Sequence, residues 1–104
     1  MTGPLERVLG AFLADPAVPR YGYDLMKGAR LPSGTLYPLL ARLERQDLVA
    51  SVWETPRQEG QRPRKYYQLT AGGIQAARLE LAQAAARRRR AVARPGHPVP
   101  GSLG

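Results

Sequence analysis

The chain has 104 residues, enough for one domain with a modest hydrophobic core that would gain from pairing with a second copy, so we expect a homodimer. Its 16 lysines and arginines outnumber its 8 aspartates and glutamates, and the net charge of +8 favours a polyanionic partner. The absence of cysteine excludes disulfides and thiolate chemistry. Because no apolar run approaches the roughly 20 residues that span a bilayer, we expect a cytoplasmic protein with no leader and no membrane partner.

The first predicted helix covers residues 5–13 and precedes an Asp15-Pro16 pair that ends it. Its apolar residues fall on one helical stripe, namely Leu5, Val8, Leu9, Phe12 and Leu13. A proline-containing loop, AVPR, follows this helix.

The second predicted helix lies within residues 21–30 and is stopped by Gly28 and Pro32. Its apolar side, barely two turns long, consists of Tyr23, Leu25, Met26 and Ala29. The few residues from Arg30 to Ser33 that join it to the next helix give a spacing typical of a helix-turn-helix. A generic helical hairpin is the alternative.

The next stretch, residues 31–49, predicts a helix over 33–46 followed directly by a strand. Its buried face consists of Leu36, Leu39, Leu40 and Leu43. The opposite face is slim near the start and cationic further on, and comprises Gly34, Pro38, Ala41, Arg42 and Arg45, flanked by Thr35 and Tyr37. Such a face suits a DNA major groove, and a core helix with a solvated face is the alternative. Ser33 is predicted to cap the helix.

A hairpin is predicted from two runs of β-forming residues, 49–54 and 64–69, joined by a polar connector. Its tip and return strand carry Arg57, Arg62, Arg64 and Lys65 against Glu59. These cations are placed to follow a phosphate backbone, and a solvated loop is the alternative.

Three aromatic residues of this hairpin carry further expectations. Tyr66 and Tyr67 alternate faces, so one should pack on the helices while the other lies at the rim. Trp53 is expected to be a core or edge anchor, in preference to a ligand-stacking residue.

The C-terminal segment predicts a helix capped by Thr70 and covering residues 71–93. Heptad-like positions hold Ile74, Ala77, Leu81, Ala84 and Ala91. We expect this stripe, which Arg88 interrupts, to form a dimer seam; a helix laid across its own domain is the alternative. Arg87 to Arg90 could contact phosphates or simply be solvated at the helix end, and residues 94–104 are expected to be disordered.

Enzymatic chemistry is not expected from this sequence. The only histidine, His97, lies in the expected tail, so one chain holds no triad, metal cluster or acid-base histidine. No phosphate-binding glycine loop of the Walker or dinucleotide type occurs. The carboxylates, such as Glu44, have basic neighbours and are read as ordinary surface charges. No cofactor and no metal are therefore expected.

Four motifs occur in a specific order: YGYDLM, SGTLYPLLARLERQDLV, Trp53, and GQRPRKYYQLT followed by a glycine. Over roughly residues 5–80 the chain thereby resembles the PadR family of bacterial winged-helix transcriptional regulators. The resemblance implies that the helix from Ser33 reads DNA, that the hairpin is a wing, and that the helices at both ends form the dimer.

The resemblance, together with the face analysis, assigns site residues. Those expected at DNA are Ser33, Gly34, Thr35, Tyr37, Pro38, Arg42, Arg45, Arg62, Arg64 and Lys65. Those expected at the dimer interface are Leu5, Leu9, Ile74, Ala77, Leu81 and Ala84.

The predicted fold is therefore mainly α with a small β-hairpin (α+β), a winged helix-turn-helix with a C-terminal dimerisation helix. Residues 1–70 would bind DNA, 71–93 would dimerise and 94–104 would be a tail. The expected function is a dimeric repressor that binds a short inverted repeat in double-stranded DNA, with a small-molecule effector left open. The alternative is a winged-helix protein-interaction module without sequence-specific DNA binding.

Overall fold

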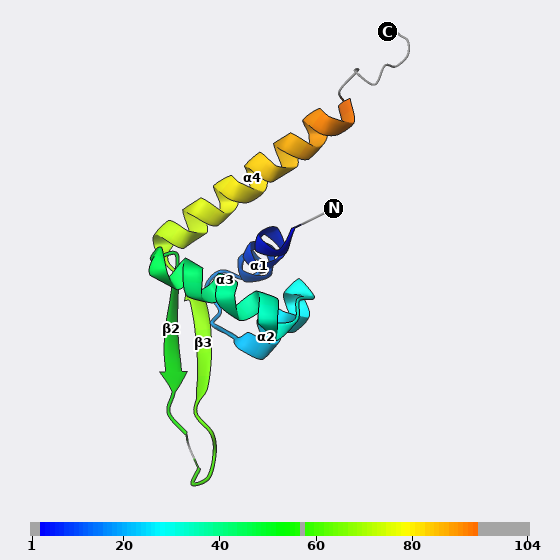
Figure 1. Cartoon of the computed structure of the whole chain (residues 1–104). Helices are drawn as coiled ribbons and strands as arrows, with labels where there is room; N and C mark the ends of the chain where they lie inside the picture. Colours follow the sequence, from blue (N-terminus) through cyan, green and yellow to red (C-terminus); the bar gives the residue numbers. More distant parts are fainter. Residues whose placement is uncertain (1–2, 57, 94–104) are drawn as a thin grey trace.

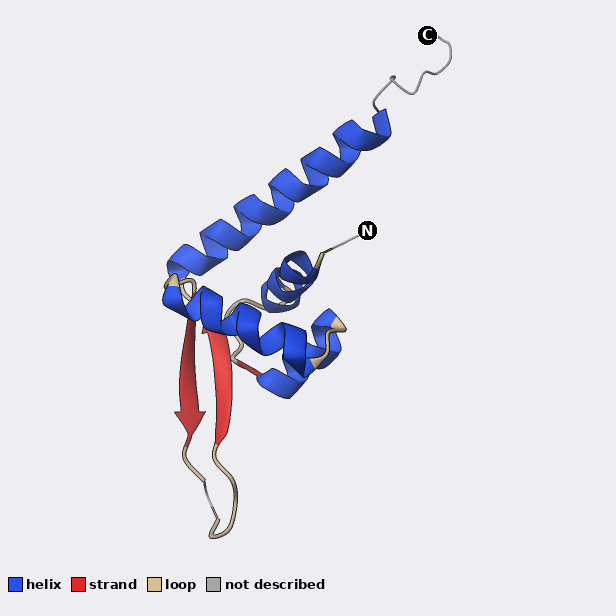
Figure 2. Cartoon of the chain, in the orientation of Figure 1, coloured by secondary structure: helices blue, strands red, loops and turns tan. Residues whose placement is uncertain are grey.

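A computed structural model describes residues 3–56 and 58–93, so the expectations for Arg57, His97 and the tail at 94–104 lie outside the described residues. Within these ranges, four helices surround one end of a three-stranded antiparallel sheet (Figure 1, Figure 2). The elements are α1 Pro4–Leu13, β1 Arg20–Tyr21, α2 Gly22–Ala29, α3 Ser33–Arg45, β2 Val49–Glu54, β3 Arg64–Leu69 and α4 Ala71–Ala93. The predicted winged helix-turn-helix fold with a long C-terminal helix is confirmed. In this part of the chain, no helix is long and apolar enough to cross a membrane.

The hydrophobic core lies where α1, α2 and α3 meet the base of the sheet. The predicted leucine face of α3 is confirmed, since Leu36, Leu40 and Leu43 are buried and Leu39 packs against them. The other elements contribute Val8, Leu9, Phe12, Leu25, Ala29, Leu31, Val49, Tyr67, Leu69 and Ala77 to the same cluster. One contiguous core therefore holds the four helices together with β2 and β3.

The second helix differs from the prediction in two respects. It continues through Gly28 and ends at Ala29, because Arg30 takes the left-handed conformation (φ 56°) that stops the helix. Gly28 faces α1, where an added Cβ would be 3.5 Å from the Cβ of Ala11, an ordinary van der Waals distance. Tyr23, which was placed on the apolar side, is 63% exposed.

The start of α3 also corrects a prediction. Ser33 is the first helical residue and not the cap, and no side chain caps the helix. The extended Pro32 precedes it, and the Pro32 carbonyl accepts from the amides of Thr35 and Leu36, both at 3.0 Å. The chain turns one residue earlier than predicted because Pro32 already has the conformation that leads into a helix.

The sheet contains the predicted hairpin and one strand that the sequence did not indicate. β2 pairs with β3 from Val49↔Leu69 to Glu54↔Arg64, and β1 pairs with the other edge of β3. The order is β1-β3-β2. β1 consists of Arg20, the last residue of the segment expected to be a loop, and Tyr21, the first residue of the segment expected to be the second helix. The hairpin starts beside the helices and projects beyond them as a narrow extension (Figure 1).

How far the hairpin projects beyond the helices determines which of its aromatic residues are buried. Tyr67 is buried against the helices while Tyr66 lies at the rim, as predicted. Trp53 shares a face with the buried Val49, yet it is 64% exposed, so of the two expected places, core or edge, the core is wrong, and Trp53 lies on the edge strand β2. The reason is that β2 has passed the edge of the helices by the time it reaches Trp53.

Helix α4 begins at Ala71, directly after Thr70, the predicted cap, and crosses α1 before it projects beyond the rest of the molecule (Figure 1). The Thr70 hydroxyl oxygen accepts from the Gly73 amide at 2.9 Å and donates to the Asp47 carbonyl at 2.8 Å. Ala77 and Ala84 are buried inside the protomer. At these two residues, α4 therefore packs across its own domain, which was the alternative to a dimer seam.

Two adjacent glycines in the first turn of α4, Gly72 and Gly73, allow a matched test of how closely this turn packs against the backbone of Leu48. An added Cβ on Gly73 would overlap the Leu48 carbonyl, whereas one on Gly72 would have only the Thr70 hydroxyl nearby, at 3.9 Å. Gly73→Ala should lower the free energy of unfolding by about 1–3 kcal/mol, because backbone has to move. Gly72→Ala should be neutral or stabilising by up to about 1 kcal/mol. Urea unfolding at one fixed protein concentration checks both, and equal values would contradict the packing described here.

Candidate nucleic-acid interface

The turn between α2 and α3 is three residues long and tightly held. The amides of Arg30 and Leu31 donate to the carbonyls of Lys27 and Met26 at 3.3 and 3.1 Å, and the Leu31 side chain is buried. The left-handed Arg30 reverses the chain direction. Because this turn has few free torsions, the position of α2 determines the position of α3.

Tyr37 forms the second link between these two helices. A Cβ on Gly22, the first residue of α2, would overlap the Tyr37 hydroxyl, so the tyrosine ring lies directly over the start of α2. Tyr37 nevertheless keeps 42% of its surface exposed. This residue, predicted to face DNA, therefore braces α3 on α2 with one side of its ring.

The outer face of α3 is open and made of small residues near its start. Ser33, Gly34 and Pro38 are exposed, Thr35 is partly covered, and an added Cβ on Gly34 would meet nothing within 4 Å. Arg45 is exposed on the same side at the last turn. The structure thus gathers most of the residues predicted for the reading face on one accessible surface.

Arg42 lies on the flank of α3 that faces α1 and α4. It is exposed but lines a groove of about 230 Å³ together with Leu5, Leu9, Gln46 and Glu80, among others. Tyr37 and Glu44 occupy the opposite flank, towards the sheet. Arg42 is therefore at the edge of the reading face, not at its centre.

Glu44 joins α3 to the wing. Its carboxylate accepts a hydrogen bond from the Ser51 hydroxyl on β2 and lies 3.6 Å from the Lys65 ammonium on β3. Lys65 also lies 5.3 Å from the Tyr67 ring centroid and 5.7 Å from that of Trp53. Burial, and then the Glu44 carboxylate, raise the pKa of the Tyr67 phenol. Lys65 is thus held against α3 with only 30% of its side chain exposed.

Arg64 belongs to a second cluster, on the other face of the hairpin. Its guanidinium lies 3.9 Å from the Tyr21 ring centroid and 3.7 Å from Glu54, whose carboxylate accepts from the Tyr21 hydroxyl at 2.9 Å. The Tyr21 and Tyr66 rings pack edge to face at 5.6 Å. This cluster ties β1 to the wing while 58% of the Arg64 side chain stays exposed.

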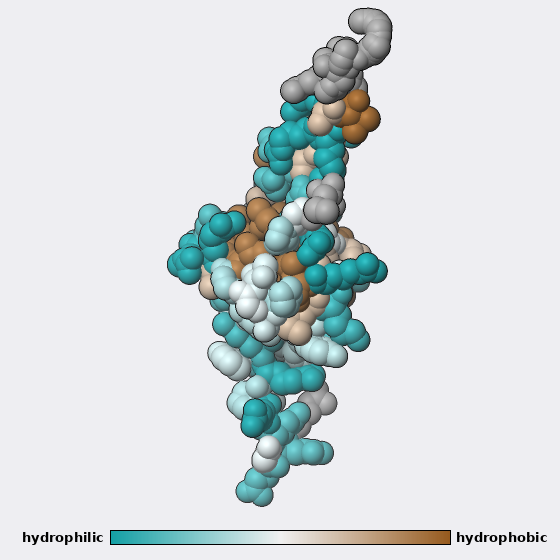
Figure 3. Space-filling model, turned by 45° about the vertical axis from the view of Figure 1, so that its right-hand side comes forward, coloured by the Kyte–Doolittle hydropathy of each residue, from teal (hydrophilic) through white to brown (hydrophobic). Residues whose placement is uncertain are grey.

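Arg62 is the freest of the three predicted wing cations. It is exposed in the connector and forms no ion pair with any residue of 3–56 or 58–93. On the face that Figure 3 shows, the projecting hairpin is mostly hydrophilic, whereas hydrophobic residues gather around the middle of the molecule. The structure therefore separates the wing cations into a held Lys65, a partly held Arg64 and a free Arg62.

Sequence reasoning missed Glu44 and Tyr21, which organise the two clusters. Glu44 was read as an ordinary surface charge and Tyr21 received no role. The alternation of Tyr67 with Lys65 on one strand face could have indicated that Lys65 lies on the helix side. Only the tertiary fold, however, shows which carboxylate it meets.

The importance of Glu44 can be measured with a double-mutant cycle of Glu44→Ala and Lys65→Ala. We expect a coupling of about 0.5–1 kcal/mol in the free energy of unfolding, because the pair is partly buried and Ser51 orients the carboxylate. The exposed Glu80–Arg87 pair on α4, at 3.4 Å, is the matched control. Urea unfolding should give it a smaller coupling, and a larger one would contradict the proposed link between α3 and the wing.

The described geometry was compared with known proteins. The sequence model of the "Transcriptional regulator PadR-like family" matches residues 12–79. A PadR-like transcription factor from Bacteroides fragilis is 36% identical, with a TM-score of 0.62 and 85% of each chain covered. A PadR family regulator from Clostridium difficile R20291 is 26% identical, with a TM-score of 0.66 and coverage of 84% of this chain and 93% of that one.

A third similar structure is the PcaV transcriptional regulator from Streptomyces coelicolor in complex with its natural ligand. It is 25% identical, has a TM-score of 0.66, and is covered over 62% of its length by 91% of this chain. The search of curated proteins gave no match. The family model covers well over half of the chain, and the fold with its turn, open helix face and hairpin agrees with it. The chain therefore belongs to the PadR-like family of transcriptional regulators.

Proposed function

We propose that this regulator is a homodimeric repressor that binds a short inverted repeat in double-stranded DNA. The observation that carries the proposal is the open face of α3, where Gly34 and Pro38 leave the helix start slim and exposed, with no group from residues 3–56 or 58–93 within 4 Å of an added Cβ on Gly34. A helix of this shape can enter a major groove closely. The net charge of +8 favours the same partner.

Different parts of α3 would have different tasks at DNA. Ser33 and Thr35 lie near the helix start, where their hydroxyls can reach base edges or a phosphate, and the exposed edge of the Tyr37 ring lies beside them. Arg45, at the other end, would contact the backbone, and Arg42 would contact it from the flank. Specificity is thus proposed to come from the first two turns.

The wing would supply contacts that do not depend on sequence. Arg62 is free to pair with a phosphate, and the exposed part of Arg64 can do so while it stays near Tyr21. Lys65 is proposed to hold the wing at its angle to α3 through Glu44. This refines the expectation that all three cations contact DNA.

Salt dependence of DNA binding separates these roles. Against a fragment enriched from random DNA by the parent protein, the slope of log affinity on log salt should flatten by roughly 1 for Arg62→Ala. The matched variant Lys65→Ala should keep the parent slope, because its charge is already paired. Fluorescence anisotropy at several salt concentrations measures both. The opposite ranking would refute this division of the wing.

The same selection experiment tests the function itself. Enrichment of an inverted repeat, with binding much tighter than to random DNA, is the expected result. If the protein enriches no sequence and binds all DNA equally weakly, that result favours the alternative function, a winged-helix module for protein contacts. Placing the repeat in a reporter promoter then checks that binding lowers transcription.

The dimer is proposed to form along α4 and the start of α1. Leu9, Ala77 and Ala84 are buried within one protomer, so among the expected interface residues Leu5, Ile74 and Leu81 still offer surface to a partner. Leu79, at 59% exposed, lies on another side of α4. The proposed seam therefore includes the Leu81 side of the helix and excludes the Leu79 side.

Two identical substitutions on α4 distinguish these sides. Leu81→Asp should give monomers that lose affinity for the repeat, because it places a charge in an apolar interface. Leu79→Asp should remain dimeric. Sedimentation velocity reports the oligomeric state, and circular dichroism shows that each variant is folded. A monomeric Leu79→Asp beside a dimeric Leu81→Asp would move the seam to the opposite side of α4.

A further inference from the structure

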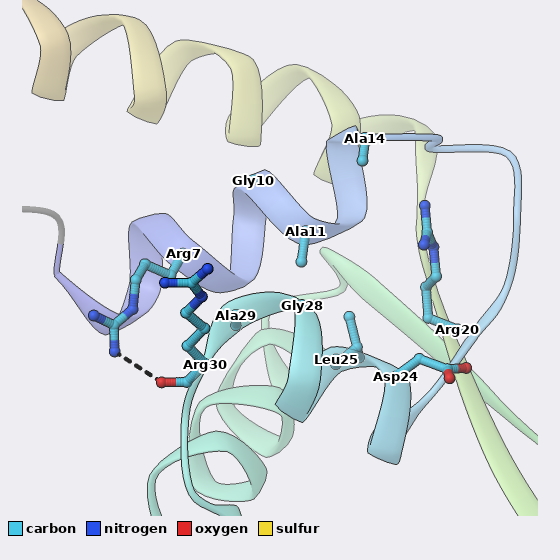
Figure 4. A pocket seen from close by; sticks show the side chains of 10 residues that line it. All are labelled: Arg7, Gly10, Ala11, Ala14, Arg20, Asp24, Leu25, Gly28, Ala29 and Arg30. Atoms are coloured by element: carbon cyan, nitrogen blue, oxygen red, sulfur yellow. Dashed lines mark hydrogen bonds between the residues drawn. The ribbon is translucent and has the colours of Figure 1, made fainter.

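A groove between α1 and α2 carries positive charge that the described residues do not neutralise. Its volume is about 470 Å³. Its lining includes the charged residues Arg7, Arg20, Asp24 and Arg30 and, in its floor, Ala11 and Leu25 (Figure 4). Three arginines and one carboxylate thus surround a floor of small apolar residues.

The groove exists because the facing residues of the two helices are small. An added Cβ on Gly10 would meet nothing within 4 Å, and one on Gly28 would meet only the Cβ of Ala11. Leu25 and Ala29 are buried and close the floor. The space is therefore apolar below and charged at its ends, which is the usual composition of a small-molecule site.

The arginines at the groove are not paired with carboxylates. Arg7 donates to the Arg30 carbonyl at 3.2 Å, as Figure 4 shows, and Arg20 donates to the Asp15 carbonyl at a long 3.5 Å. Neither of them, nor Arg30, forms an ion pair within the described part of the chain. Two guanidinium groups, from Arg7 and Arg30, lie at the same end of the groove (Figure 4).

Two further observations show that the positive charge of the groove is poorly compensated. The Nε atoms of Arg7 and Arg20 are shielded from solvent and have no hydrogen-bond partner among the described residues. A partly desolvated cation without a counter-charge is unfavourable, so an anion at the groove would be stabilised. The only carboxylate of the lining, Asp24, is occupied, because it accepts from the Tyr21 amide at 3.1 Å and so caps α2.

We propose that this groove binds a small molecule that carries an oxyanion, either a carboxylate or a phosphate. The planar forks of Arg7 and Arg30 match two oxygens of such a group. The floor around Ala11 and Leu25 would cover the apolar remainder of the ligand. The site is independent of the DNA-binding role, since it uses no residue of the proposed DNA surface.

Isothermal titration of the full chain with inorganic phosphate, and separately with succinate, tests the site. We expect saturable one-to-one binding of at least one of the two anions. Arg7→Gln and Arg30→Gln should each weaken it roughly 10- to 100-fold, the effect of losing a charge-assisted hydrogen bond. The matched control is Arg89→Gln, which removes an equal charge from the exposed end of α4 and should change nothing.

A groove-filling variant adds a test that leaves every charge in place. Gly10→Leu should abolish binding with an unchanged circular dichroism spectrum, because its side chain would occupy the groove. Should this variant fail to fold, the two glutamine variants decide. Binding of phosphate alone or of succinate alone supports the site and identifies the anion, and binding of both supports the shared chemistry.

Three results would overturn the proposal. The first is the absence of saturable heat for either anion. The second is equal affinity in the parent, Arg7→Gln and Arg30→Gln, or an equal loss in Arg89→Gln, which would show general charge attraction only. The third is a loss of DNA affinity in Arg7→Gln and Arg30→Gln when neither anion binds, which would assign these arginines to the DNA backbone.

Discussion

The burial of one face of α3 is the constraint on which the rest of the structure depends. Leu36, Leu40 and Leu43 are almost completely removed from solvent, and each buried leucine contributes about 1.5–3 kcal/mol. Rotating α3 about its axis would expose them, so its orientation is fixed. Because the side chains of a helix keep constant angles to one another, the same burial decides that Gly34 and Pro38 face outward.

The two flanks of α3 connect this orientation to the rest of the molecule. On one flank, Tyr37 rests on α2 and Glu44 holds the wing through Lys65 and Ser51. On the other, Arg42 borders the groove formed with α1 and α4. The proposed recognition surface is thus a helix that contacts α2 and the hairpin on one flank, where a polar contact between Glu44, Ser51 and Lys65 joins it to β2 and β3.

The parts of this architecture that follow from local periodicity could be predicted from the sequence. The leucine spacing of α3 and the β-forming runs of the hairpin gave correct elements, and the motif order gave the correct family. β1 escaped detection because two residues carry no period. Trp53 was misplaced because its burial depends on how far the hairpin extends past the helices, which no local pattern contains. The helix is preceded by Pro32 and not by Ser33 as its cap residue, and this depends only on the extended backbone conformation of Pro32.

Long-range partners explain the remaining differences, and one of them bears on how the chain is made. Arg88, which interrupts the apolar stripe of α4, pairs with Glu6 of α1 at 2.9 Å, although 82 positions separate them. The stripe before it covers α1 with Ala77 and Ala84. In the nascent chain, α2 becomes available to pack on α1 before α4 does, so one side of the apolar face of α1 stays exposed until α4 follows. A nascent chain arrested before α4 therefore leaves that side of α1 open to chaperones and proteases, and the Arg88–Glu6 ion pair can form only once the later turns of α4 have been made.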